Sequence, residues 1–193
     1  MKIRLQQLLV VGSLMAALIS CEPMPDDLLV RHFRIEKGEH YSSPRLIETL
    51  QSNSLIFTAK FDESAMYDLG DAAMQSNKNK LLGFADCNSL HHENSARFAW
   101  QWYNNQLEIY AYCYVSSERI EKYVGTVNIN ELNRFEIALT DSAYLFYMNG
   151  AEPIRIIRDQ KCAAGVYYML WPYFGGTLPA PQQMTIDIAI THS

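Results

Sequence analysis

Residues 84–115 have the sequence FADCNSLHHENSARFAWQWYNNQLEIYAYCYV, and this stretch decides the fold. Apolar and polar residues alternate through residues 96–103 and again through residues 106–115. An alternation with a period of two is typical of a β-strand that buries one face. The intervening Asn104-Asn105 is typical of a two-residue hairpin loop, because asparagine tolerates positive φ angles. We therefore predict an antiparallel hairpin around this loop.

A two-residue loop sets the register of the predicted hairpin, with Trp100 opposite Ile109 and Arg97 opposite Tyr112. A slip of one residue would mix the two faces of both strands, so their clean separation supports this register. One face is apolar, and we expect it to join the core: Phe98, Trp100, Trp102, Leu107, Ile109, Ala111, Cys113 and Val115. The other face is polar but rich in tyrosine: Arg97, Gln101, Tyr103, Glu108, Tyr110, Tyr112 and Tyr114.

The tyrosine-rich face has two interpretations. Tyrosine rings offer flat surfaces to sugar C–H groups, and amide, carboxylate and guanidinium groups hydrogen-bond sugar hydroxyls. On the other interpretation the tyrosines are cross-strand pairs that stabilise the sheet, or they lie beneath residues 62–80. The sequence leaves both open. On the first, the glycan-binding residues are Arg97, Gln101, Glu108, Tyr110, Tyr112 and Tyr114.

Short alternating segments continue along the rest of the chain. Turn residues separate them at Asp141-Ser142 and at Asn149-Gly150, and the latter pair favours a type I′ turn. About ten short strands joined by such turns predict an all-β fold, an antiparallel β-sandwich, with a single domain over residues 31–193. The further strands are expected near residues 33–35, 55–61, 81–85, 119–127, 134–139, 143–148, 154–157, 166–173 and 184–190.

Two segments are less regular. Residues 62–80 are polar, and we expect one short helix there or a long loop over the sheet. The aromatic segment at residues 167–176, YYMLWPYFGG, is expected to begin as a buried strand and to lead into a Gly/Pro loop. Trp171 or Tyr173 would then line the rim of a binding groove or pack at the edge of the sandwich.

Residues 1–20 have the composition of a secretory signal peptide. A basic start precedes an apolar run at residues 8–18, which is too short to span a bilayer comfortably. The run ends in LISC, which resembles a bacterial lipobox and implies cleavage before Cys21 and acylation of that cysteine. Residues 21–30 would form a lipidated tether. We expect a membrane-anchored lipoprotein of the bacterial outer membrane, on its periplasmic or its outer side; an uncleaved anchor is the alternative.

Three cysteines remain once Cys21 carries lipid. Cys113 belongs to the predicted core face, whereas Cys87 and Cys162 lie in turn-like contexts. We therefore expect a Cys87–Cys162 disulfide, which an envelope location permits. Three free thiols are the alternative. The cysteine spacing is not typical of a zinc site.

Metals, cofactors and nucleic acid are not expected from the sequence. His91-His92-Glu93 lacks the i, i+4 spacing of metal ligands on a helix, and we expect a loop at the rim of the hairpin instead. Four carboxylates from Asp62 to Asp71 lack the spacing of a calcium-binding EF-hand. The net charge is −5 and no basic patch stands out, so we expect no nucleic-acid partner.

Residues 135–156, FEIALTDSAYLFYMNGAEPIRI, resemble the late hairpins of concanavalin A-like jelly-roll domains. The wider pattern over residues 32–190 is similar to an uncharacterised group of Bacteroidetes envelope proteins. The jelly-roll resemblance implies a curved sheet whose concave face often binds glycans. A shared fold does not by itself define that function.

We expect a non-catalytic module that binds a glycan or another surface polymer. The first alternative is a jelly-roll polysaccharide lyase or glycoside hydrolase. Lyases of this fold use Tyr, His, Arg and Gln on the concave sheet, and these residue types are present here, whereas the E-x-D-x-x-E strand of the jelly-roll glucanases is absent. The second alternative is a structural or adhesion protein without a small ligand.

Overall fold

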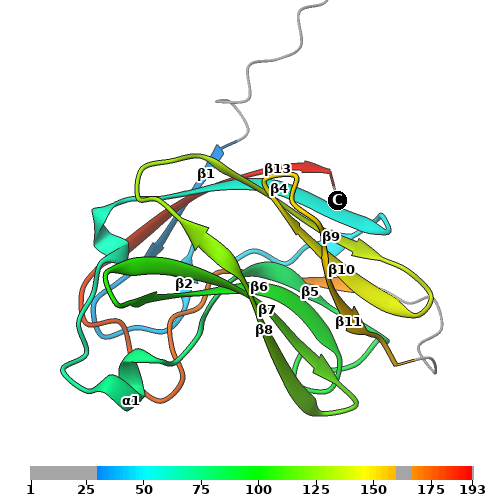
Figure 1. Ribbon diagram of the computed structural model, residues 1–193, viewed down its shortest axis with the longest axis horizontal. Coiled ribbons are helices and arrows are strands. Elements are labelled where there is room, and N and C mark those ends of the chain that lie inside the picture. The colour runs from blue at the N-terminus through cyan, green and yellow to red at the C-terminus, as the bar shows by residue number, and fades with distance from the viewer. Residues whose placement is uncertain (1–29, 160–166, 193) are drawn as a thin grey trace, which may run out of the picture.

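The computed structural model describes residues 30–159 and 167–192. Two antiparallel β-sheets lie face to face and form a β-sandwich (Figure 1). The predicted signal peptide and the predicted lipidation site Cys21 lie outside the described residues. Across the two described ranges, the chain contains no helix with the length and apolar character needed to span a bilayer.

The first sheet has seven strands, including the first and last strands of the described chain. Leu55, Phe57, Ala59 and Phe61 alternate with partly exposed residues, as expected for a strand with one face on the core. In spatial order the strands are β11 (Ile154–Ile157), β10 (Ala143–Met148), β9 (Asn133–Leu139), β4 (Ser54–Phe61), β13 (Met184–His192), β1 (Val30–Ile35) and β2 (Ser42–Ser43).

The second sheet has six strands and contains the predicted hairpin as β6 and β7. The predicted register is confirmed, with Trp100 opposite Ile109 and Arg97 opposite Tyr112. Asn104 has a φ angle of 50° at the hairpin loop, as expected for a two-residue turn. In spatial order the strands are β3 (Thr49–Leu50), β12 (Tyr167–Leu170), β5 (Asn79–Ala85), β6 (Ser95–Tyr103), β7 (Gln106–Val115) and β8 (Glu118–Val127).

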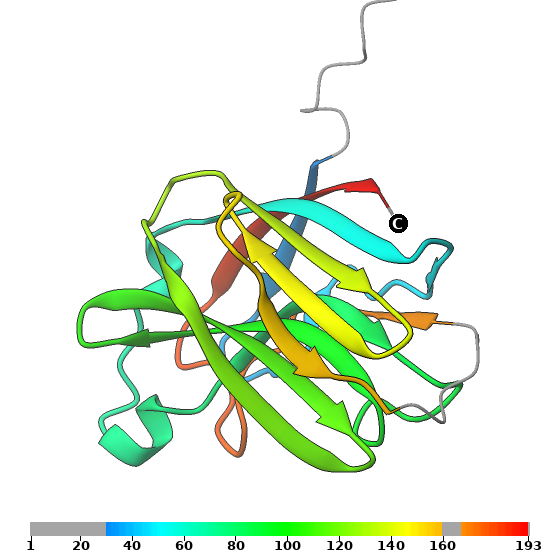
Figure 2. The same ribbon diagram turned by 45° about the vertical axis from the view of Figure 1, so that its right-hand side comes forward.

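The core between the sheets is built largely from aromatic rings. Phe98 contacts Phe135 and Phe146 of the opposite sheet, with ring centroids 4.9 and 5.1 Å apart. The predicted core face of the hairpin is confirmed, and within it only Trp102 and Val115 are partly exposed. Each fully buried large side chain contributes about 1.5–3 kcal/mol before its lost entropy is subtracted. In Figure 2, β8 of one sheet runs beside β11, the edge strand of the other, at one side of the sandwich.

Tight turns join the consecutive strands. Asn149 and Gly150 have φ angles of 52° and 77°, which confirms the turn predicted between β10 and β11. Ser116 and Ser117 make an equivalent turn between β7 and β8, with φ angles of 51° and 69°. Serine seldom adopts positive φ, so composition alone does not predict this turn.

The prediction of a buried strand over residues 166–173 is only partly right. β12 ends at Leu170, because the chain bends before Pro172, which has no N–H to donate to a ladder. Tyr173 then makes an isolated bridge to Lys80, with N···O distances of 3.0 and 2.8 Å. Tyr168 is half exposed, since only the two-residue strand β3 lies outside β12.

The polar segment after β4 holds a 3-10 helix, η2 (Glu63–Ala65), and one short helix, α1 (Ala72–Gln75), as predicted. Its carboxylates accept backbone N–H groups: Asp62 from Ser64 and Asp71 from Ala73. These aspartates therefore act as helix caps. Gln75 donates to the carbonyl of Trp102 at 2.7 Å, which fixes α1 against the end of β6.

A buried ion pair joins the turn after β5 to the end of β11. Asp86 is fully buried, and Arg158 reaches it with two hydrogen bonds of 2.6 and 2.9 Å. The hydroxyl of Tyr144 donates to the same carboxylate at 2.6 Å. Charges buried this deeply require such complete pairing, so this cluster fixes how the two sheets meet.

Candidate functional site

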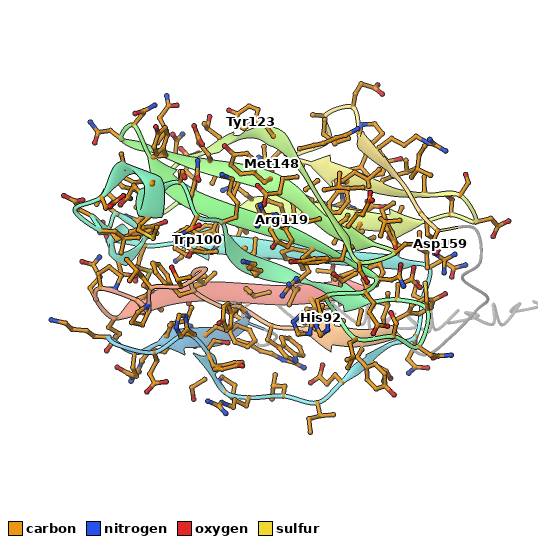
Figure 3. All side chains as sticks on the ribbon, turned by 90° about the horizontal axis from the view of Figure 1, so that it is seen from below. His92, Trp100, Arg119, Tyr123, Met148 and Asp159 are labelled. Carbon is orange, nitrogen blue, oxygen red and sulfur yellow. The ribbon has the colours of Figure 1, made fainter. Side chains whose placement is uncertain are left out.

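A cavity of about 840 Å³ lies on the outer face of the six-stranded sheet, the side turned away from the core. Strands β5 to β8 supply its floor, and residues 41–46, 91–92 and 171–176 supply its walls. Figure 3 views the molecule from this side, with Arg119 and His92 near the middle. Volumes of this size are typical of sites that bind small ligands. We call it the outer-face cavity.

Arg97 lies in the floor of the cavity and is only 7 % exposed. Its guanidinium carbon lies 5.7 Å from the ring centroid of Tyr112, its partner across the hairpin, which is within the range of a cation–π contact. The Nε atom is buried and has no hydrogen-bond partner among the described residues. Burial lowers the pKa of Arg97 to about 10, so the side chain remains charged at neutral pH.

Gly83 on β5 makes the position of Arg97 possible. A Cβ atom at residue 83 would lie 2.1 Å from the carbonyl oxygen of Ala96 and 2.6 Å from Cγ of Arg97. Both distances are far below van der Waals contact. Only glycine therefore lets the Arg97 side chain lie across β5.

Lys80 approaches the same tyrosine from β5. Its ammonium nitrogen lies 4.7 Å from the ring centroid of Tyr112 and donates to the carbonyls of Lys78 and Gly175 at 2.8 and 3.1 Å. Burial and the nearby charge of Arg97 lower the pKa of Lys80 to about 8. The floor thus holds two cations close to one aromatic ring.

The outer-face cavity is basic although the chain is acidic overall. Glu121 is the one carboxylate among its described lining residues, and it pairs with Arg119 at 3.1 Å. No basic patch stands out in the sequence, because the cations that line the cavity are spread along the chain from Arg45 to Arg119. The cations come from separate strands and loops and gather only in the folded chain: Arg45, Lys78, Lys80, Arg97 and Arg119.

Gln101, Glu108 and Tyr110 lie on the same outer face but form a network of their own. Tyr110 donates to Glu108 at 2.7 Å, and the amide nitrogen of Gln101 lies 2.5 Å from the same carboxylate oxygen. Lys78 donates to the amide oxygen of Gln101 at 2.8 Å and lies 4.3 Å from the ring centroid of Tyr110. The Gln101 amide, the Tyr110 hydroxyl and one carboxylate oxygen of Glu108 therefore already have partners within the protein.

The structure divides the six predicted ligand-binding residues into two groups. Arg97, Tyr112 and Tyr114 line the outer-face cavity, whereas the Gln101 network does not. Lys80 and Arg119 could not be recognised as cavity residues from the sequence, because an isolated basic residue in a strand is usually exposed to solvent.

Two further predictions concern the cavity walls. His91 and His92 lie at its rim, as expected for the loop before β6. Burial and the charge of Arg97 lower the pKa of His91, which favours the neutral imidazole. Trp171 lines the cavity and also stacks on the core residue Phe33 at 5.4 Å, so it both rims the groove and packs the sandwich edge.

The cysteines are partly described. Cys113 is a free, buried thiol on the core face, and burial raises its pKa. Cys87 is disulfide-bonded. Cys162 lies outside the described residues, so its pairing with Cys87 stays a prediction.

Lys80→Met is expected to stabilise the fold by about 1–2 kcal/mol at pH 7. The lowered pKa means that the ammonium is costly in the folded state, at about 1.4 kcal/mol per pKa unit, and the two lost hydrogen bonds offset part of the gain. Between pH 8 and about 10.4 the unfolded chain binds more protons at Lys80, so this cost shrinks as the pH rises.

Urea unfolding at pH 7 and pH 10 measures this difference. The gain of Lys80→Met over the wild type should be largest at pH 7 and nearly absent at pH 10. Lys37→Met, at an exposed lysine, serves as the control and should change stability little at either pH. A destabilised Lys80→Met protein at pH 7 would contradict the assignment of a costly buried charge.

No protein-family model matches this sequence, and no curated protein matches it. Solved structures do match it by fold. The chain has the concanavalin A-like β-sandwich fold. This confirms the predicted fold class, an antiparallel jelly-roll sandwich.

Three such structures illustrate the match. A family 16 glycoside hydrolase from a mixed-linkage glucan locus of Bacteroides ovatus, in complex with its product, has a TM-score of 0.54 at 8% identity, covering 83% of this chain and 80% of that one. An alginate lyase in complex with dimannuronate has a TM-score of 0.52 at 11% identity, covering 83% and 71%. An uncharacterised protein from Mycobacterium paratuberculosis has a TM-score of 0.52 at 8% identity, covering 83% and 81%. At these identities the likeness establishes the fold alone.

Proposed function

We propose that this protein is a lipid-anchored envelope module that binds a glycan in the outer-face cavity. The observation that carries the proposal is the cavity itself, about 840 Å³ in volume and built on the tyrosine-bearing face of the six-stranded sheet. Its aromatic lining and its charged groups are the chemistry that sugar rings and their polar substituents require. The anchor rests on the lipobox-like run that ends at Cys21.

The fold adds support of a general kind. Two proteins with this fold were solved in complex with a glucan product and with dimannuronate. Fold likeness cannot transfer an activity, so the proposal depends on the residues of this chain. The Gln101 amide and the Tyr110 hydroxyl already have partners in the protein and lie outside the cavity lining, so we expect the ligand contacts at Tyr112 and Tyr114 rather than at Tyr110.

Tyr112→Ala is expected to weaken glycan binding at least about tenfold, roughly 1.4 kcal/mol. Tyr112 lines the cavity beneath two cations, so its removal takes away an aromatic surface and disorders Lys80 and Arg97. Tyr110→Phe should bind within about twofold of the wild type, because Tyr110 lies outside the cavity lining. A glycan array followed by calorimetry on the strongest ligand measures both.

Two results would count against the proposal. An array without any bound glycan would remove the function, and equal losses in Tyr112→Ala and Tyr110→Phe would move the site away from the cavity. Melting temperatures of both variants must be compared, because Tyr112 is itself mostly buried.

An enzyme is the second candidate, and the cavity favours a lyase over a hydrolase. Glycosidases need two carboxyl groups across the scissile bond, whereas Glu121 alone is found among the described lining residues and is paired with Arg119. An elimination needs a base and an acid instead. His91, whose lowered pKa favours its neutral form, and the tyrosines Tyr112 and Tyr114 supply those types. Release of unsaturated oligosaccharides from polymers bound on the array would establish this activity.

A further inference from the structure

We propose that the ligand of the outer-face cavity is an acidic glycan, whose carboxylate or sulfate group is bound by the guanidinium of Arg97. This inference rests on the proposed function and specifies its ligand class. A neutral sugar and an acidic sugar make different demands on a site. The charge of the cavity and the lack of a counter-charge for Arg97 among the described residues favour the acidic sugar.

The first argument is the sign of the local charge. The net charge of the chain is −5, yet the described residues that line this one cavity include five lysine and arginine side chains and one carboxylate. Like charges so close together destabilise the folded protein. Burial is the largest cause of the lowered pKa of Lys80, and the charge of Arg97 lowers it further. An anion in the cavity would relieve this repulsion.

The second argument is the unpaired Nε atom of the Arg97 guanidinium. The Arg97 side chain is only 7 % exposed, and its Nε has no hydrogen-bond partner among the described residues. The fully buried Asp86, by contrast, has a counter-charge, because Arg158 donates two hydrogen bonds to it. Among the described residues, Arg97 has a tyrosine ring beside it and no carboxylate partner. A planar guanidinium that lines a cavity and has no counter-charge among the described residues matches an oxyanion.

The third argument is the aromatic lining, which selects a sugar over other polyanions. Tyr112, Tyr114 and Tyr173 line the cavity together with the cations. Rings beside cations suit a sugar that carries an acidic substituent. A nucleic acid would require an extended basic surface, whereas these cations gather in one cavity with walls from residues 41–46, 91–92 and 171–176.

The test compares acidic glycans with neutral partners of the same backbone. Polygalacturonate, polymannuronate and hyaluronan are each paired with their carboxyl-reduced derivatives, dextran sulfate is paired with dextran, and single-stranded DNA is added. We expect at least about tenfold tighter binding of an acidic member than of its neutral partner, with a decrease at high salt. The carboxylate and sulfate pairs identify which acid group is bound.

Arg97→Met should reduce binding of the acidic polymer about tenfold to a hundredfold, because it removes a charge-assisted contact. Arg119→Met should reduce affinity for the acidic polymer a few-fold. Because Arg119 is exposed, this variant tests the charge of the cavity even if the buried Arg97→Met substitution impairs folding. Arg134→Met is the matched control. It removes the same charge from β9 in the opposite sheet and should leave affinity unchanged.

The outcomes separate the inference from the proposed function. Equal or tighter binding of the neutral partners overturns the inference and leaves the glycan-binding function intact. No binding to any polymer overturns both. A third outcome is that single-stranded DNA binds as tightly as the best acidic glycan and loses the same affinity in Arg97→Met. The cavity would then bind phosphate groups without selecting a sugar, which also overturns the inference. Selective, Arg97-dependent binding of an acidic glycan supports it.

Discussion

Arg158→Met is expected to lower the free energy of unfolding by about 3–5 kcal/mol, the usual cost of leaving one member of a buried ion pair alone. Asp86 is fully buried and receives two hydrogen bonds from Arg158. Without the guanidinium, the carboxylate keeps the Tyr144 hydroxyl and the backbone N–H of Cys87 but loses its counter-charge. A loss of this size approaches the total stability of many small domains.

Urea unfolding of purified protein measures the effect, with Arg155→Met as the matched control. Arg155 lies three residues earlier on β11 and makes an exposed hydrogen bond of 3.2 Å to Ser142, so its loss should cost less than about 0.5 kcal/mol. Combining Asp86→Asn with Arg158→Met should recover part of the loss, since no unpaired charge remains. A single Arg158→Met variant within 1 kcal/mol of the wild type would contradict this role.

Much of the fold could be predicted from local pattern. The alternation around Asn104-Asn105 predicts the register of β6 and β7 correctly, because a slip of one residue would bury Arg97 in the core and expose Trp100. Strands that repeat this period and end in turn residues are found where alternation places them. The two-residue strands β2 and β3 are too short to show a period, and neither was predicted.

The candidate site is less visible in the sequence because it is assembled from distant segments. Alternation correctly places Arg97, Tyr112 and Tyr114 on one face, since all three belong to one hairpin. Lys80 reaches the same cavity from β5 and Arg119 from β8. Nothing in the chain near either residue indicates a partner. The charge of the cavity is therefore a property of the topology and not of any sequence window.

The role of Gly83 also could not be predicted from the sequence. A glycine inside a strand can mark a bulge or a close approach of another backbone, and the sequence does not say which. The structure has both features, since the register of β5 against β6 shifts between Lys80 and Gly83. The space at Gly83 is filled by Arg97 and by the backbone of Ala96. The close approach of β5 and β6 at Gly83 therefore determines where Arg97 lies in the cavity floor.

Gly83→Ala is accordingly expected to destabilise the protein by about 3 kcal/mol and to abolish binding of the cavity ligand. The new Cβ would meet the Ala96 carbonyl at 2.1 Å and the Arg97 Cα at 2.5 Å, and backbone atoms cannot rotate away as a side chain can. β5 and β6 would have to separate, which displaces Arg97 from the floor. Urea unfolding gives the first effect, and binding below the unfolding transition gives the second.

The control for this prediction is Gly125→Ala, the same substitution in β8. There the new Cβ would meet only the terminal methyl of Met148, at 2.7 Å, and that flexible side chain can move aside. We expect a change of less than about 1 kcal/mol and unaltered ligand binding. If the two alanine variants lost equal stability, strand glycines would matter here only for backbone entropy. If Gly83→Ala alone lost stability but still bound ligand, Arg97 would not depend on the space that glycine leaves.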